Sequence, residues 1–267
     1  MKQALIFSIM ALILVLFSFA CSPINYQLPP TIPSPAATVT PTKTPTIAGT
    51  PINTATPTTT CTGTTYSDNY SSNTLGNYSY YDGGWTASSA SALEWNIASS
   101  ELQEAVTTWM DSYIVANNST FSQSLGDYKV EGDFKLDTVG QGVFGLVFRA
   151  TAASGLAYIF QWNGVNGRWE IEKQYNTGGT SYYYPGTNSS SPYTLGTWIH
   201  LKVVAGPGNL FNAWITPAGG PTQQIFSGVT DPGTTTPLTT GGVGIRSYNI
   251  LAGNTLHVQN FLASTCP

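Results

Sequence analysis

The sequence is poor in charged residues. Only 8% of its 267 residues are Asp, Glu, Lys or Arg, and the formal net charge is −4. If Lys2 leaves with a cleaved leader, the net charge becomes −5, with 8 basic residues against 13 acidic ones. Nucleic-acid binding relies on a stripe of Lys and Arg. The chain has no such stripe, so we exclude nucleic acid as a partner.

Histidine and cysteine are also scarce, with two and three residues respectively. Neither His200 nor His257 stands in a Ser/His/Asp arrangement, a His-x-x-x-His spacing or a carboxylate cluster, so the sequence predicts no catalytic residue and no metal site there. Cys61 and Cys266 stand at opposite ends of the predicted folded domain. In an oxidising compartment we expect them to form a disulfide. Cys21 is then the odd cysteine, which suggests a separate role.

The N-terminus holds a long apolar run, Ala4–Ala20, preceded by Lys2. This pattern predicts a signal peptide over residues 1–20, because the run is short for a membrane span. Ser18–Cys21 resembles a bacterial lipobox, in which the cysteine receives a lipid. The small residues Ser18 and Ala20 also satisfy an ordinary signal-peptidase site. Either route predicts a protein on the extracellular side of the cell envelope, lipid-anchored through Cys21 or secreted.

Residues 21–60 are predicted to be a linker. Between Pro23 and Thr60 there are 9 Pro and 12 Thr, and Lys43 is the only charged residue. Such a composition buries too little apolar surface to fold, and the regular proline favours an extended chain. The linker is therefore expected to act as a stalk for the domain at residues 61–267.

Abundant Gly, Tyr and Trp with little charge favours an all-β domain. Apolar and charged residues alternate from Tyr128 to Asp137, as expected for a strand with one dry and one wet face. Asn163–Gly167 has the composition of a tight turn. Ser100–Asp111 fits helical spacing, with an irregular strand as the alternative. The other predicted strands are Trp85–Ala87, Leu93–Ile97, Ser112–Ala116, Val143–Ala150, Leu156–Trp162, Trp169–Tyr175, Trp198–Val204, Leu210–Thr216, Gln224–Ser227, Val243–Tyr248 and Leu256–Leu262.

Several motifs resemble the concanavalin A-like lectin and glucanase (laminin-G-like) jelly rolls of bacterial surface proteins. They are Tyr66–Asn69 with Leu75–Tyr78, Gly145–Ala150, Arg168–Glu170, Thr197–Val203 and Gly241–Arg246. The resemblance covers nearly the whole domain and implies two antiparallel sheets packed face to face, one of them concave. It says less about activity, because one fold hosts unrelated functions.

The resemblance also suggests two sites to test. Laminarinase-like hydrolases of this fold carry Glu-x-Asp-x-Glu on one strand; here Glu170, Glu172 and Gln174 stand in that register. Gln174 takes the place of the acid/base and cannot deliver a proton. We therefore predict no catalytic residue and expect two exposed carboxylates. The family often binds calcium through an Asp such as Asp68, but Gln259 and Asn260 offer amides where a second Asp is usual, so no cofactor is predicted beyond a possible structural calcium.

Aromatic residues are the best indication of a ligand. The polar segment Thr180–Tyr193 contains Tyr182, Tyr183 and Tyr184, predicted as a loop whose rings stack on sugars. Trp162 and Trp214 are added to this surface, Trp214 because it is out of phase with its apolar neighbours. The alternative is that such rings fill the core, which we expect of Trp85, Trp169 and Trp198. Arg149 and Arg246 are predicted to anchor buried polar networks.

These features together predict a surface-anchored, noncatalytic module that binds extracellular or cell-wall polysaccharide. Its only expected association with the membrane is the lipid anchor. One alternative is a structural or adhesive envelope protein that acts through protein contacts or self-association. A second alternative is a laminarinase-like glycoside hydrolase.

Overall fold

The computed structural model describes residues 61–63, 65–83, 94–105, 111–137, 142–151, 155–174, 182–231, 236–248 and 254–266. All of them lie within one unit, Ala55–Pro267. In this part of the chain, no helix is long and apolar enough to span a membrane. The predicted signal peptide, Cys21, the linker and the strand Trp85–Ala87 lie outside the described residues.

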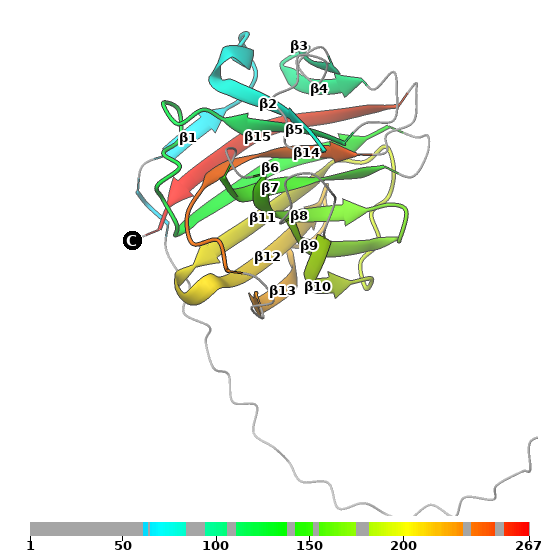
Figure 1. Cartoon of the computed structure of the whole chain (residues 1–267). Helices are drawn as coiled ribbons and strands as arrows, with labels where there is room; N and C mark the ends of the chain where they lie inside the picture. The colour runs from blue at the N-terminus through cyan, green and yellow to red at the C-terminus, as the bar shows by residue number, and fades with distance from the viewer. Residues whose placement is uncertain are drawn as a thin grey trace, which may run out of the picture. The chain divides into compact units, whose positions relative to one another are not determined.

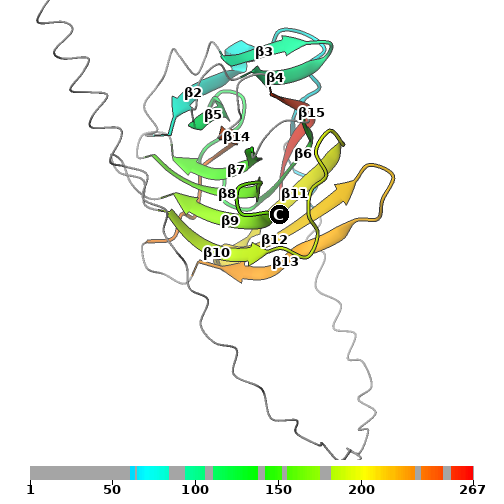
Figure 2. The same cartoon turned by 90° about the vertical axis from the view of Figure 1, so that its right-hand side faces the viewer.

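Two antiparallel sheets are stacked face to face (Figures 1 and 2). In sheet A, β1 pairs with β15 beside the main path of strands. In spatial order that path is β13 (Gln223–Thr230), β12 (Leu210–Pro217), β11 (Ile199–Gly206), β6 (Tyr128–Leu136), β15 (Thr255–Thr265), β4 (Glu101–Ala105) and β3 (Trp95–Ala98), with β1 spanning Thr65–Asp68.

Sheet B has seven strands and adjoins sheet A where β10 meets β13. Two short 3-10 turns, η1 (Leu75–Asn77) and η3 (Pro207–Asn209), complete the regular structure of the described residues. In spatial order the strands of sheet B are β10 (Tyr182–Asn188), β9 (Arg168–Gln174), β8 (Leu156–Asn163), β7 (Val143–Thr151), β14 (Gly242–Tyr248), β5 (Asp111–Ala116) and β2 (Tyr78–Asp82).

The main core lies between the sheets. In β6 the predicted alternation is confirmed, because every second residue from Tyr128 to Leu136 is buried. Phe134 stacks on Phe144 of sheet B with ring centroids 5.7 Å apart. Trp169 is fully buried beside Phe160, as predicted. Because alternate residues of a strand point to opposite faces, the remaining side chains of both sheets point away from this core.

Two local predictions are wrong. The helix predicted within Ser100–Asp111 is the strand β4 where the structure describes it, because β4 pairs with β3 and β15 and alternates the buried Leu102 and Glu104 with Gln103. The predicted loop at Thr180–Tyr193 contains β10, which pairs with β9. Pro185 is tolerated there because β10 is an edge strand with a register shift between Tyr183 and Gly186.

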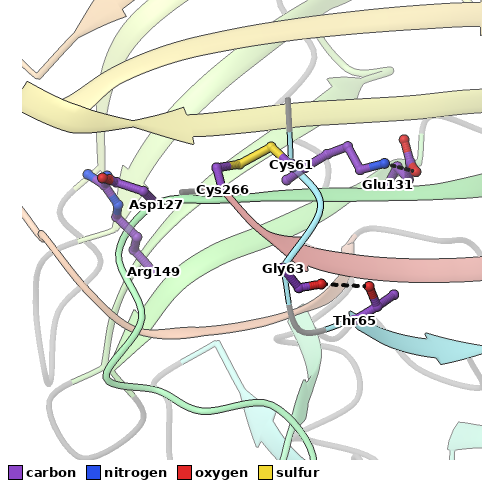
Figure 3. The surroundings of a disulfide bond; sticks show 8 residues. Cys61, Gly63, Thr65, Asp127, Glu131, Arg149 and Cys266 are labelled. Atoms are coloured by element: carbon purple, nitrogen blue, oxygen red, sulfur yellow. Dashed lines mark hydrogen bonds and ion pairs between the residues drawn. A yellow bond between two sulfur atoms is a disulfide. The ribbon is translucent and has the colours of Figure 1, made fainter. Parts of the chain in front are cut away.

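The predicted disulfide is confirmed. Cys61 and Cys266 are bonded with sulfurs 1.97 Å apart, at the two ends of the folded domain (Figure 3). Beside the bond, the Gly63 amide donates to the Thr265 carbonyl at 3.1 Å. The disulfide thus holds the start of β1 and the end of β15 together across 205 residues of sequence.

Candidate functional site

The outer face of sheet A carries an ordered row of polar and aromatic side chains. His200 and Lys202 of β11 point to this face, and Trp198, which directly precedes β11, continues the same two-residue spacing. On the neighbouring strand, Thr216 pairs with His200 and Trp214 pairs with Lys202. The sheet therefore presents two indole rings on one face with hydroxyl and charged groups between them.

A hollow of about 300 Å³ opens on this face where β11 begins and β12 ends. Trp198, which the sequence predicted to lie in the core, is half-buried at its wall. The signal for this was present, because Trp198 is in phase with the polar His200 and Lys202. The remaining lining residues are Asp133, Ile199, His200, Thr216, Pro217, Ala218, Gly219, Gly220 and Gln259.

His200 is held by two carboxylates of β6. Its Nδ1 lies 2.7 Å from Asp133 Oδ1, and its Nε2 lies 3.6 Å from Glu131 Oε2. Hydrogen bonds to Asp133 and then Glu131 raise the pKa of His200 from its ordinary 6.5 to about 9, against the opposing effect of burial. The imidazole is therefore protonated at neutral pH. The hollow offers a fixed cation, carboxylate and amide oxygens, and a hydroxyl.

Each indole on this face has a lysine beside it. Lys135 Nζ lies 5.2 Å from the centre of the Trp198 ring, and Lys202 Nζ lies 4.5 Å from that of Trp214. Lys202, which pairs with Trp214, is four residues beyond Trp198, so the two rings stand about 13 Å apart along the strands. Both indoles are half-buried, which leaves ring surface for a ligand.

The structure separates Trp162 and Trp214, two of the predicted ligand residues. Tyr182, Tyr183 and Tyr184 lie on β10, and their side chains are outside the described part of the chain. Trp162 is 6% exposed and packs between the sheets, 5.2 Å from Trp169. Trp214 is on the outer face of sheet A, where its phase placed it.

The outer face of sheet B holds the carboxylates that the resemblance singled out. The prediction that they are exposed is wrong: Glu170 is 0% and Glu172 is 2% exposed. Glu170 accepts hydrogen bonds from Gln161, Asn163 and Arg168. Burial raises the pKa of Glu172, and the nearby positive charge of Arg246 opposes this rise.

Arg246 is the centre of this buried network, as predicted. Its guanidinium donates to both oxygens of Asp111 at 2.9 Å, to Glu172 Oε1 at 2.8 Å and to Gln161 Oε1 at 2.8 Å. Gly145 of β7 pairs with both Arg246 and Gln161, so the Arg246 side chain passes over Gly145 where it reaches Gln161. A Cβ at this position would collide with the Phe160 carbonyl oxygen of β8, so Gly145 lets β7 and β8 approach closely.

These contacts show that sheet B is concave on its outer face. The Tyr113 hydroxyl of β5 donates to Gln174 Oε1 of β9 at 2.9 Å, although β14, β7 and β8 lie between those strands. Side chains four strands apart can meet only if the sheet curves. The Gln174 amide also donates to the Gly83 carbonyl at 3.1 Å. The concave face of sheet B is thus bridged by its own side chains.

The described residues contain no group of three or more His, Cys, Asp or Glu that could hold a metal ion. Asp68, the residue expected to bind calcium, is 4% exposed. Its Oδ2 accepts from the hydroxyls of Thr74 at 2.6 Å and Tyr78 at 3.0 Å, and its Oδ1 accepts from the Tyr70 amide at 2.9 Å. This environment suits a carboxylate bound by donors better than one bound to a cation.

Comparison with known proteins supports the fold. No family model and no curated protein matches the sequence. Peanut lectin is similar in structure, with a TM-score of 0.50 at 10% identity over 76% of this chain and 98% of that chain. Lectin I-B4 from Griffonia simplicifolia has a TM-score of 0.48 at 12% identity, over 77% and 100% of the two chains. The likeness to peanut lectin, with the two-sheet topology, shows a concanavalin A-like jelly roll.

Proposed function

We propose that the domain is a noncatalytic module that binds extracellular or cell-wall polysaccharide on the outer face of sheet A. The observation that carries the proposal is the hollow in which Trp198 stands beside Asp133, His200 and Gln259. An indole offers a flat apolar surface to a sugar ring. The carboxylate, imidazolium and amide groups around it offer hydrogen bonds to sugar hydroxyls.

The second indole extends this surface. Trp214 lies about 13 Å from Trp198 along the strands, with Thr216 and His200 between them. Such a spacing suits a chain of several sugar units better than a single sugar, because two separated rings can contact the same chain. The surface is thus proposed to bind along a polysaccharide.

The cellular setting of the proposal rests on the sequence. The leader at residues 1–20, the lipobox-like Cys21 and the Thr/Pro stalk at residues 21–60 support a domain held outside the cell, either lipid-anchored or secreted. A stalk of this composition would let the domain reach polysaccharide beyond the membrane surface.

The test is a polysaccharide-binding screen of the full chain together with Trp198→Ala and Trp214→Ala. Loss of a stacked indole is expected to weaken binding by about 1–2 kcal/mol, roughly tenfold, at either position. Asp133→Asn keeps the shape of the side chain and should weaken binding by removing a charged acceptor. Retained thermal stability of each variant separates loss of binding from loss of fold.

Tyr183→Ala is the comparison variant for the other predicted surface. If Tyr183→Ala abolishes binding while Trp198→Ala does not, the ligand lies at β10 and the sheet A assignment is wrong. If no polysaccharide binds, the carbohydrate proposal fails and a protein contact or self-association takes its place. Reducing-sugar release that Glu170→Gln abolishes would instead establish a hydrolase.

A further inference from the structure

A buried pair of carboxylates stands at the β3 edge of sheet A. Glu104 lies on β4 and is 0% exposed, while Glu94 directly precedes β3 and is 8% exposed. Trp95, next to Glu94, pairs with Glu104 across these two strands. The negative charge of Glu94 acts on Glu104, so the two carboxylates lie in one environment.

Each of these carboxylates has an oxygen that makes no hydrogen bond within the described part of the chain. Glu104 Oε2 accepts from the Ser247 hydroxyl of sheet B at 2.5 Å, but among the described residues Glu104 Oε1 and Glu94 Oε2 have no hydrogen-bond partner. A buried carboxylate oxygen without a donor is costly, and native proteins rarely retain one. Among the residues that the structure describes, these two oxygens therefore lack a positively charged or hydrogen-bond-donating partner.

Nothing among the described side chains supplies that group. None of the ion pairs formed by the described residues includes Glu94 or Glu104. The pKa of Glu104 is raised to about 8 by burial and further by the negative charges of Glu94 and Asp111, with the Ser247 hydroxyl opposing. A bound cation would relieve both the repulsion and the two unpartnered oxygens.

The groups that the described strands place near this pair carry oxygen atoms. Asn254, which is 1% exposed, directly precedes β15, whose Thr255 pairs with Ala105 next to Glu104. This position at the start of β15 places a buried amide next to β4, the strand that carries Glu104. Hard divalent cations prefer carboxylate, amide and hydroxyl oxygens, whereas zinc and copper sites use histidine and cysteine.

We propose that Glu94 and Glu104, with Asn254 and Ser247 beside them, bind a hard divalent cation, calcium in the first instance. The site joins β3 and β4 of sheet A to β14 of sheet B, because Glu104 bonds Ser247 across the core. Its role is structural: it fastens the edge of sheet A to the facing sheet. It is separate from the polysaccharide surface and from Asp68.

The probe is terbium, which replaces calcium at oxygen sites and luminesces when excited through a nearby tryptophan. Trp95, adjacent to Glu94 in the sequence and paired with Glu104, is the expected sensitiser. The full chain should give terbium luminescence that calcium displaces, and calcium should raise its melting temperature relative to chelator. A parallel titration with magnesium shows which of the two cations the site prefers. Glu104→Gln keeps the shape of the side chain, removes one charge and should lower cation affinity at least about tenfold.

Glu101→Gln is the matched control. Glu101 is on the same strand but points to the opposite face, where it contacts His257 at 2.6 Å. This variant should keep the luminescence and the calcium-dependent rise in melting temperature. If Glu104→Gln does not fold, Glu94→Gln serves as the second test of the same site.

Two results would overturn the proposal. The first is a wild-type chain with neither terbium luminescence nor a melting shift with calcium or magnesium, which would leave Glu104 buried as a neutral, protonated acid. The second is a folded Glu104→Gln or Glu94→Gln variant that binds calcium as tightly as the wild type. Binding of magnesium in preference to calcium would keep the site and change the cation.

Discussion

The two outer faces of the sandwich carry the same kinds of charged group in different surroundings. On sheet A, Lys129 pairs with Glu131, and their side chains are 22% and 14% exposed. On sheet B, Arg246 pairs with Asp111 and Glu172, and all three side chains are between 3% and 8% exposed. The Lys129–Glu131 pair of sheet A is thus in contact with solvent, whereas the Arg246 network of sheet B is dry.

The difference has energetic and functional consequences. An exposed pair gains little because water competes with it, so its members can exchange partners with a ligand at small cost. A buried pair cannot lose one member without stranding the other charge in a medium of low dielectric. The wet face is therefore suited to recognition, and the dry face fixes the curvature of sheet B.

The largest expected effect is on the dry face. Arg246→Met removes the cation and leaves Asp111 and Glu172 buried without it, so the free energy of unfolding should fall by about 3–5 kcal/mol. Urea denaturation of the purified chain measures it. A loss below about 1 kcal/mol would mean that solvent reaches the network, and the contrast between the faces would be lost.

A smaller effect on the free energy of unfolding is expected at Gly145, where β7 and β8 approach closely. A Cβ added at Gly145 would lie 2.2 Å from the Phe160 carbonyl oxygen and 2.6 Å from Gln161 Cα, so the backbone must move. Gly145→Ala should cost about 1–3 kcal/mol in the same measurement. Gly132 of sheet A is the control, because its added Cβ would come no nearer than 3.4 Å, to the Phe134 ring. Equal losses at both glycines would show that the close approach of β8 imposes no special constraint at Gly145.

The sequence predicted sheet A better than sheet B for a physical reason. Alternation in β6 identifies one dry and one wet face, and sheet A obeys that rule. In β9 the same rule predicts exposed Glu170 and Glu172, yet both are buried because contacts between distant strands close the concave face. The one local sign was Arg246, an arginine inside an apolar strand, which did predict a buried network.

The candidate binding surface was predicted only in part. Trp214 alternates with buried apolar residues along β12, which correctly predicted that it points outward. The same reasoning applied to Trp198 would have placed it beside His200. The hollow itself depends on Asp133 and Gln259, which reach it from β6 and β15. Spacing within one strand carries no information about such neighbours. Trp162, assigned to the ligand surface from its residue type, lies in the core.

The stability of the domain should depend on pH through His200, on the outer face of sheet A. The pKa of His200 is raised to about 9 in the folded chain from 6.5. Its contribution to stability is therefore complete below pH 6.5 and is lost as the pH rises through 9. Because His200 is about one-third exposed, the loss should be no more than about 1 kcal/mol. Urea denaturation across this range, compared with His200→Gln, should show the slope only in the wild type; identical slopes would exclude the contribution of the Asp133 and Glu131 contacts.

The smallest expected effect completes the contrast with Arg246. Lys129→Met removes the cation from a pair whose atoms are only 2.6 Å apart, closer than the 2.8 Å between Arg246 and Glu172. Distance alone would rank the surface pair as the stronger. Solvent exposure predicts the opposite ranking. The free energy of unfolding should fall by less than about 1 kcal/mol, because water replaces the lysine and Glu131 keeps its contact with His200. If Lys129→Met destabilises the chain as much as Arg246→Met, then geometry rather than solvent exposure governs these pairs, and the wet face is less free to exchange its partners for a ligand than we propose.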